Sequence, residues 1–318
     1  MGRVSSRSRN CISRLLALSD LDSDGVAGWG IDFSWDAFGD NSINDRNQVY
    51  LVTNAIVLDG LLMALEAGIV EDEYIDRVRT AVVSALLGSM KSFTLTEMGG
   101  YFWYSNSIND AINVPNVGAY LSGISMKALS LRNDWFTPDQ KALILDHVDR
   151  SVKTLLTKVR YAGDGTPYWA YVDENFASPN DLVHHGYTVL GLWTYQSYGG
   201  AVKLPFDATI LAKSFHAFVI NGKPTEYQQN LPELDANLRS IPTRVWAPGF
   251  AAEVLVLLQD ISSAELFLDS LMSDYGIFPN VRYTPIASIP EPSNVFYSRT
   301  VSHVLPGLAR LAIQKRGY

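Results

Sequence analysis

The chain has 318 residues, of which 47% are hydrophobic and 18% charged, and its formal net charge at pH 7 is -8. This composition is typical of a globular protein with a sizeable core, and the acidic balance argues against nucleic acid or an anionic membrane as the main partner. The single cysteine, Cys11, excludes an internal disulfide. No apolar run approaches the roughly 20 residues of a membrane span. Arg14 interrupts the apolar stretch of the basic N-terminus, so we expect a soluble protein with no cleavable signal peptide and an unknown compartment.

An acidic loop follows the first expected helix, at about residues 6–18. It places three acids at alternate positions and then a glycine, Asp20, Asp22, Asp24 and Gly25. That is the first half of an EF-hand loop, but Ile31 stands at the twelfth position, where calcium binding needs a glutamate. We expect a plain acidic turn, with calcium as the weaker alternative and no other cofactor.

The rest of the chain repeats one pattern, in which a long aromatic and polar loop leads into an apolar helix and then into an amphipathic one. Apolar helices are expected at about 48–67, 115–131, 181–195, 248–258 and 301–315, and amphipathic ones at about 71–91, 137–159, 206–220 and 262–271. The helix over 137–159 opens with a capping start, Thr137-Pro138-Asp139-Gln140. The apolar helices recur with a period of about 66 residues and a shorter last step, which is the signature of a helical repeat.

The two kinds of helix predict two layers. A helix that is apolar all round is buried on all sides, whereas one with charge on a single face lies outside. The sequence therefore predicts an all-α protein, an α/α toroid of about five helical-hairpin repeats that forms one domain over residues 1–318. All loops entering the apolar helices would then lie on one rim.

Those loops carry the aromatic and polar side chains suited to a polysaccharide or oligosaccharide. Aromatic faces stack on sugar rings while amides and guanidinium groups bind the hydroxyls. The expected substrate-binding residues are Trp29, Trp35, Trp103, Tyr104, Asn106, Asn116, Trp169, Tyr171, Arg244 and Trp246. The alternative is that each aromatic side chain plugs its own repeat.

The helix that begins at Asp181 carries a group of titratable side chains in its first turn. Asp181 lies three and four residues before His184 and His185, on one helical face, and Tyr187 follows. Asp181 is also a candidate N-cap. Adjacent histidines diverge by about 100 degrees on a helix, so we expect no metal site here.

The repeat pattern resembles α/α-toroid carbohydrate-active enzymes: toroid polysaccharide lyases, glucuronyl C5-epimerases and toroidal glycoside hydrolases. In addition, Tyr297-Ser-Arg299 before His303 is similar to the Tyr-Asp-Leu-Arg-His segment of the epimerases, although the spacing differs and the aspartate is absent. The lyase resemblance implies β-elimination on a uronate-containing glycan. The base and acid would come from Tyr187, His184, His185 or Tyr297, and the uronate carboxylate would be held by Asn106, Asn116, Arg244 or Arg299.

Three other readings stay open. A glycoside hydrolase would use two carboxylates, and the candidate acids are Asp32, Asp36, Asp110, Asp173, Glu174 and Asp181. A C5-epimerase would use the same proton abstraction as the lyase. A non-catalytic glycan-binding toroid would need the aromatic loops but not the titratable cluster.

Overall fold

The structure, a computed structural model, describes residues 6–38, 41, 43–244, 246–275 and 298–316. The chain divides into two compact units. The first comprises Met1–Thr157 with Gly191–Lys203, and the second Lys158–Leu190 with Leu204–Tyr318. Each unit is described by itself, and the expectation of one domain stays a prediction.

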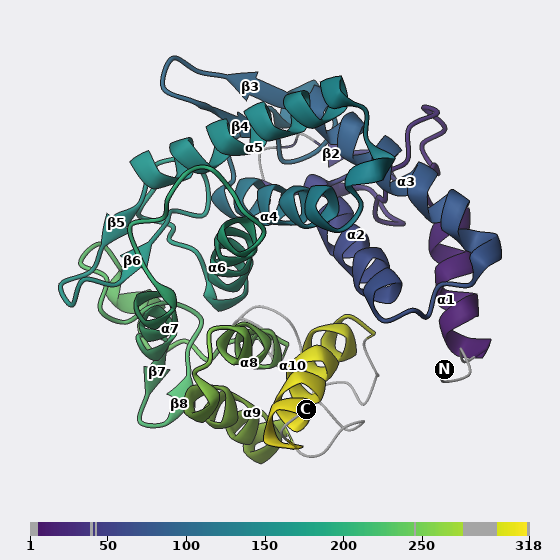
Figure 1. Ribbon diagram of the computed structural model, residues 1–318. Coiled ribbons are helices and arrows are strands. Elements are labelled where there is room, and N and C mark those ends of the chain that lie inside the picture. Colours follow the sequence, from purple (N-terminus) through teal and green to yellow (C-terminus); the bar gives the residue numbers. More distant parts are fainter. Residues whose placement is uncertain (1–5, 39–40, 42, 245, 276–297, 317–318) are drawn as a thin grey trace. The chain divides into compact units, whose positions relative to one another are not determined.

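Among the described residues, the first unit is built on five helices and part of a sixth, with short hairpins between them (Figure 1). Its elements are α1 (Ser6–Ala17), β1 (Trp35–Asp36), β2 (Ile43–Asn44), α2 (Leu51–Glu66), α3 (Asp72–Lys91), β3 (Phe93–Leu95), β4 (Gly100–Phe102), η1 (Ile108–Asp110), α4 (Pro115–Leu131), η2 (Asn133–Trp135) and α5 (Pro138–Thr157). The C-terminal half of α6 (Leu182–Ser197) also belongs to it. Helix α4 packs against both α2 and α5.

Burial separates the helices of this unit as the composition predicts. Every residue of α4 from Pro115 to Leu129 is buried, whereas α3 and α5 each bury only one face. Helix α5 begins with the expected capping box, in which the Gln140 amide nitrogen lies 3.3 Å from Thr137 Oγ1 and the Thr137 amide donates to Gln140 Oε1 at 2.9 Å.

Glycine permits the closest helix approach in the first unit. A Cβ atom added at Gly191 of α6 would lie 2.2 Å from the backbone carbon of Ala119 in α4. No side chain fits between the two helices at this point. Glycine is therefore required at position 191, because the backbones of α4 and α6 are in close contact there.

The second unit repeats the alternation of hairpin and helix. Its elements are β5 (Arg160–Tyr161), β6 (Pro167–Tyr168), the N-terminal half of α6, α7 (Ala208–His216), β7 (Val219–Ile220), β8 (Lys223–Pro224), η3 (Ala236–Leu238), α8 (Ala247–Leu257), α9 (Ile261–Tyr275) and α10 (Ser298–Arg316). Helix α8 is buried from Ala247 to Val256 and packs against α9 and α10 (Figure 1).

Most helices of the structure begin close to the residues at which the sequence predicts them to begin. The apolar ones begin at Leu51, Pro115, Leu182, Ala247 and Ser298. The expected helix over 206–220 is too long, because α7 ends at His216 and the β-branched pair Val219–Ile220 forms β7. The segments before α2, α4, α6 and α8 also hold short antiparallel hairpins, β1–β2, β3–β4, β5–β6 and β7–β8, none of which was expected from the sequence.

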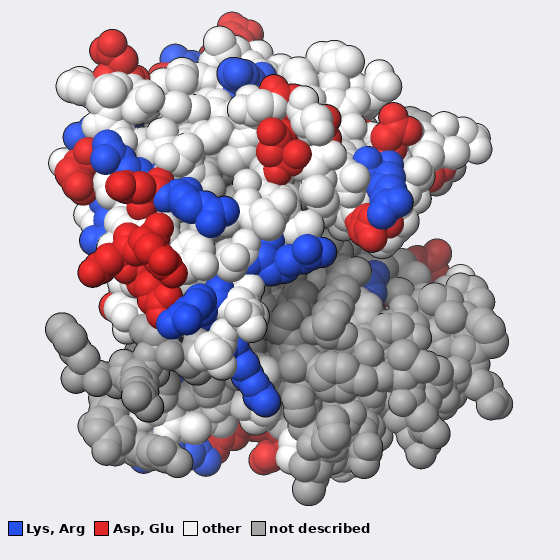
Figure 2. Space-filling model, turned by 90° about the vertical axis from the view of Figure 1, so that its right-hand side faces the viewer, with Lys and Arg blue, Asp and Glu red and all other residues white. Residues whose placement is uncertain are grey.

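Opposite charges lie side by side on the surface. On the face drawn in Figure 2, basic and acidic side chains of the described residues are interspersed among uncharged ones. Within the first unit, Arg150 Nε lies 2.9 Å from Asp146 Oδ2 one helical turn away. Among the described residues, no helix is both long and apolar enough to span a membrane.

Candidate active site

The first turn of α6 holds a histidine–carboxylate pair. Asp181 precedes the helix, and its Oδ1 accepts a hydrogen bond from the His184 backbone amide at 2.9 Å, as an N-cap does. The same oxygen lies 2.7 Å from Nδ1 of the His184 imidazole. One carboxylate therefore caps the helix, as considered from the sequence, and also orients the imidazole.

Arg244 joins this pair to a second acid. Its Nη1 lies 3.0 Å from Asp181 Oδ2, and its Nε lies 3.1 Å from Glu226 Oε1. Glu226 Oε2 accepts hydrogen bonds from Thr243 Oγ1 at 3.0 Å and from the Arg244 amide at 3.1 Å. The Glu226 carbonyl accepts the amide of Leu182 at 2.8 Å, which ties this strand-like segment to the start of α6.

Burial differs sharply within this group, which we call the His184 cluster (Asp181, His184, Glu226 and Arg244). The exposed fraction of the side chain is 1% for Glu226 and 7% for Asp181, against 18% for His184 and 23% for Arg244. A molecule in solvent therefore reaches the imidazole and the guanidinium before it reaches either acid.

The environment moves the pKa values of the two acids in opposite directions. Burial by itself would raise the pKa of Asp181, but His184 and then Arg244 outweigh it and hold that pKa well below its usual range. Burial and the nearby charge of Asp181 raise the pKa of Glu226, and Arg244 opposes them. Asp181 is accordingly the ionised acid of the cluster at neutral pH.

Two tyrosines lie beside the His184 imidazole. The Tyr171 ring meets it edge-on with centroids 4.8 Å apart, and the centroid of the Tyr187 ring lies 6.2 Å away. Tyr187 is only 5% exposed and packs on Phe250 at 4.6 Å. Tyr171 is half-buried, so of the two tyrosines it is the more accessible beside the imidazole.

His185 points away from this group, into the core of the second unit. It is fully buried among Trp169, Phe215 and Phe218, and its Nε2 lies 2.7 Å from Ser214 Oγ. Burial lowers the pKa of His185 to about 3, so the ring is neutral at pH 7. The structure thus distinguishes the two adjacent histidines and gives the accessible position to His184.

The remaining predicted residues of the second unit are mostly interior. Trp169 is fully buried and packs edge-on against Phe206 at 6.0 Å. Trp246 is 6% exposed and lies under the Arg244 guanidinium at 6.0 Å. Tyr297 lies outside the described residues, and Arg299 lies in the first turn of α10. A substrate role for these four residues stays a prediction.

Most predicted sugar-binding side chains of the first unit also have contacts within the fold. The Trp29 indole donates to the Leu15 carbonyl at 2.9 Å and is 4% exposed, and the Trp103 indole donates to Thr94 Oγ1 at 2.8 Å. Tyr104 is buried, and its ring centroid lies 5.3 Å from that of Tyr50. These contacts fit the alternative in which aromatic side chains plug their own repeat.

Three other predicted residues of this unit differ in exposure. Trp35 is 39% exposed and packs on Tyr50 at 5.9 Å. Asn106 is half-buried, and its amide nitrogen lies 3.4 Å from Asp22 Oδ2. Asn116, in the first turn of α4, is 2% exposed, and its Oδ1 has no hydrogen-bond partner among the described residues. Their role in substrate binding stays a prediction.

The acidic loop after α1 brings its three carboxylates together. One ligand oxygen from each of Asp20, Asp22 and Asp24 lies within 4.8 Å of the others. The turn also uses them, since the Val26 amide donates to Asp24 Oδ1 at 2.7 Å and the Gly25 amide to Asp20 Oδ1 at 3.3 Å. These hydrogen bonds are those of the acidic turn expected from the sequence.

Glu226 is the member of the cluster that the sequence analysis missed. It lies in a stretch with no helical or strand periodicity, directly after the β7–β8 hairpin. Its one sequence signal is an acid between uncharged residues, Thr225 and Tyr227, which does not distinguish it from other loop acids.

Comparison with known proteins yields a likeness of fold. No protein-family model and no curated protein matches the sequence. A solved structure of D-mannose isomerase is similar, with a TM-score of 0.60 and 13% identity over 89% of this chain and 75% of that chain. A reducing-end-xylose releasing exo-oligoxylanase complexed with xylose has a TM-score of 0.47 and 14% identity, over 99% of this chain and 86% of that chain. Cellobiose 2-epimerase from Spirochaeta thermophila has a TM-score of 0.40 and 11% identity, over 99% of this chain and 100% of that chain. The likeness to D-mannose isomerase confirms the expected all-α, α/α-toroid fold class.

Proposed function

We propose that this chain is a carbohydrate-active enzyme that moves a carbon-bound proton beside a sugar carbonyl, with His184 as the general base. The observation that carries the proposal is the 2.7 Å contact between His184 Nδ1 and Asp181 Oδ1 on an accessible imidazole. The similarity to D-mannose isomerase is one of fold alone. It supports a carbohydrate substrate by analogy and gives no support for a particular reaction.

The contact supports a role for one particular imidazole nitrogen. Asp181 is ionised, because His184 and Arg244 hold its pKa low against the effect of burial, and an ionised carboxylate only accepts hydrogen bonds. In the neutral form of the imidazole that a general base requires, Nδ1 therefore carries the hydrogen, and Nε2 keeps the lone pair that serves as base. In an isomerisation, Nε2 removes the proton from C2 of an open-chain aldose to give an enediolate. Return of that proton to C1, with transfer of the O2 hydrogen to O1, gives the ketose.

The charges around Arg244 favour a neutral sugar over a uronate. A uronate lyase needs a cation or amide to neutralise the substrate carboxylate. Arg244, the candidate cation, already meets Asp181 at 3.0 Å and Glu226 at 3.1 Å. A third carboxylate would have to compete with two buried ones, so isomerisation or epimerisation of a neutral sugar is preferred here to β-elimination.

Glycoside hydrolysis is the second candidate, and one observation favours it. Glycosidases pair an acid of raised pKa with one that stays ionised, and the pKa values of Glu226 and Asp181 are moved apart in this sense. The exposure argues the other way, because Glu226 is 1% exposed and has no access to a glycosidic oxygen. A non-catalytic glycan-binding role accounts for aromatic loops but not for the oriented imidazole.

Proton transfer is tested directly by solvent exchange. The protein is incubated in deuterium oxide with D-mannose, D-glucose, D-fructose and D-xylose, and proton NMR follows loss of the C2 proton and appearance of isomers. We expect His184→Asn to lower the exchange rate by about a hundredfold or more. The matched control is His216→Gln, because His216 is 54% exposed and pairs with Asp260 outside the cluster.

Parallel assays separate the alternatives. Uronate-containing polymers are followed by the ultraviolet absorbance of an unsaturated uronate, and neutral polymers by new reducing ends. If turnover that depends on His184 gives an unsaturated uronate, the reaction is β-elimination and not isomerisation. If it gives new reducing ends, the reaction is hydrolysis. Full activity of His184→Asn on any substrate would refute the assignment of the base.

A further inference from the structure

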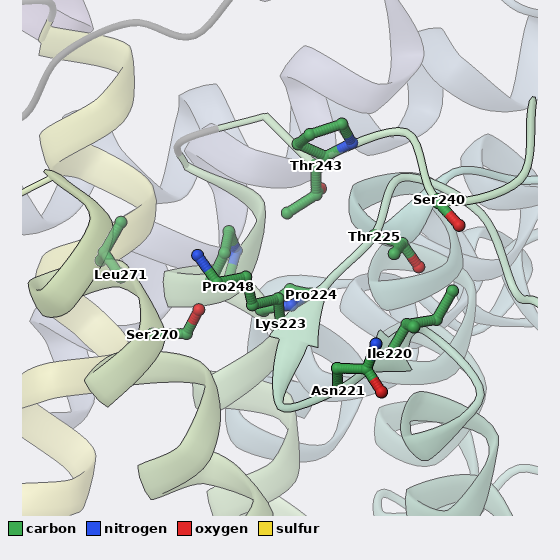
Figure 3. A pocket seen from close by; sticks show the side chains of 11 residues that line it. Ile220, Asn221, Lys223, Pro224, Thr225, Ser240, Thr243, Pro248, Ser270 and Leu271 are labelled. Atoms are coloured by element: carbon green, nitrogen blue, oxygen red, sulfur yellow. The ribbon is translucent and has the colours of Figure 1, made fainter.

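A pocket separate from the exposed face of His184 lies in the second unit (Figure 3). Its walls come from the β7–β8 hairpin, the segment 240–243, the first turn of α8 and the middle of α9. Its volume is about 360 Å³. Ligand pockets span about 300–1,000 Å³, so this one is sized for a small molecule.

The hairpin wall is fixed by short-range hydrogen bonds. Thr225 Oγ1 donates to the carbonyl of Phe218 at 2.8 Å, and the Thr225 amide donates to the same carbonyl at 2.6 Å. The turn of the hairpin consists of Asn221 and Gly222, with φ of 51° and 77°. Two successive left-handed residues make the tight turn that suits a two-residue hairpin, and Gly222 takes that conformation without strain.

The opposite rim holds a strained residue. Ser240 adopts a φ of 61°, which is uncommon for a side chain other than glycine, asparagine or aspartate. Its amide donates to Gln229 Oε1 at 3.2 Å, which helps to hold it there. Strained backbone of this kind concentrates at ligand sites.

The lining alternates apolar surface with uncharged polar groups. Pro224, Pro242 and Pro248, with Ile220 and Leu271, supply rigid apolar walls (Figure 3). The Ser240 and Ser270 hydroxyls and the Asn221 amide supply groups that can both donate and accept hydrogen bonds, whereas the Thr225 and Thr243 hydroxyls donate within the fold. Among the described residues that line the pocket, Lys223 is the only charged one and none is an acid, although the chain carries 33 Asp and Glu residues. A ligand that presents C–H faces and hydroxyls of both hydrogen-bonding senses fits this lining.

The pocket shares one wall with the His184 cluster. Thr243 lines it and is 4% exposed, and its Oγ1 donates to Glu226 Oε2 at 3.0 Å. Glu226 in turn holds Arg244 at 3.1 Å. A molecule in the pocket would therefore contact Thr243, whose hydroxyl bonds the buried acid, while none of the four cluster residues lines the pocket.

We propose that this pocket binds one ring of a neutral sugar, as a second saccharide site distinct from the one at His184. The prolines and Leu271 face the apolar side of the ring, and Ser240, Ser270 and Asn221 exchange hydrogen bonds with its hydroxyls. The volume admits a single ring rather than a chain. This binding does not depend on turnover, so it stands or falls separately from the proposed function.

Amide NMR of the full chain tests the site. D-mannose, D-glucose and D-xylose are titrated in the millimolar range into wild type and into His184→Asn, with inorganic phosphate as the anionic probe. We expect at least one sugar to shift the amides of Asn221, Gly222 and Ser240 in both proteins, and phosphate to leave them unchanged. Absence of sugar-induced shifts at these amides overturns the proposal, and shifts with phosphate alone overturn the assignment to a neutral sugar.

A pocket-filling variant locates the ligand. Ser270→Phe places a ring in the pocket and should raise the sugar Kd by about tenfold or more, which corresponds to about 1.4 kcal/mol. Ser273→Phe is the matched control, because Ser273 lies on the same helix but lines only the adjoining groove. Thermal unfolding of both variants checks that they are folded. Loss of binding in Ser273→Phe with retention in Ser270→Phe would refute the placement.

Discussion

Protonation of His185 should weaken the fold in acid. Ser214 Oγ donates its own hydrogen to the Leu211 carbonyl at 2.7 Å, so it accepts one from His185 Nε2, 2.7 Å away. Nδ1 is buried and has no hydrogen-bond partner among the described residues. A proton added to Nδ1 would therefore create a buried cation whose new N–H has no acceptor.

The size of the effect follows from the two pKa values. Burial lowers the pKa of His185 from 6.5 to about 3, so between these values the unfolded chain binds more protons than the folded one. The free energy of unfolding contributed by this residue is then constant above pH 6.5 and decreases as the pH falls. The slope approaches about 1.4 kcal/mol per pH unit, which gives a loss of about 2.7 kcal/mol by pH 4.5.

The assay is urea denaturation of wild type and His185→Gln at intervals between pH 7.5 and 4.5. Glutamine keeps a donor near the Nε2 position for Ser214 but does not titrate. The variant should be less stable than wild type at pH 7.5, and the difference should shrink as the pH falls, because only wild type loses the His185 contribution. Subtracting the curves cancels the other titrating groups. A difference that stays constant over this range would refute the buried neutral imidazole.

Four further substitutions test the packing and the charges. Gly191→Ala, whose Cβ would lie 2.2 Å from the Ala119 backbone, should destabilise the chain by about 3 kcal/mol or more in urea denaturation. Gly60→Ala, with nothing within 4 Å, should instead stabilise it by about 0.5–1 kcal/mol, and equal effects of the two would contradict the close approach. Trp29→Phe removes a 2.9 Å indole hydrogen bond and should lower both Tm and the free energy of unfolding, the latter by about 1–3 kcal/mol. An unchanged Tm would argue against a structural role for the Trp29 indole. Arg244→Gln leaves two buried carboxylates without their cation and should cost about 3 kcal/mol of unfolding free energy at pH 7, and a neutral effect would mean that the cluster is solvated.

The repeat was predictable because it depends on local composition. Helices that are apolar all round differ from helices with one charged face at the level of sequence, so α4 and α8 stand apart from α3 and α5. Capping residues such as Thr137 and Asp181 act within three residues of their own position, and their hydrogen bonds were correctly anticipated. The short hairpins were missed, because two paired residues are too few to show a period.

The chemistry of the site depended on contacts between distant positions. The sequence placed Asp181, His184 and His185 on one helix but gave no means to tell the histidines apart, since adjacent residues point about 100 degrees apart and either direction can face the core. Packing decided it, because Trp169, Phe215 and Phe218 surround His185 and leave His184 accessible.

Glu226 and Arg244 show the same division between sequence and structure. Nothing near either residue in the chain pairs it with Asp181, yet Arg244 lies 3.0 Å from that carboxylate and 3.1 Å from Glu226. The sequence by itself determined which segments become helices and which of them are buried. Only the tertiary structure decided which charges meet, because the free energy of a buried charge depends on its partners in space and not on its neighbours in sequence.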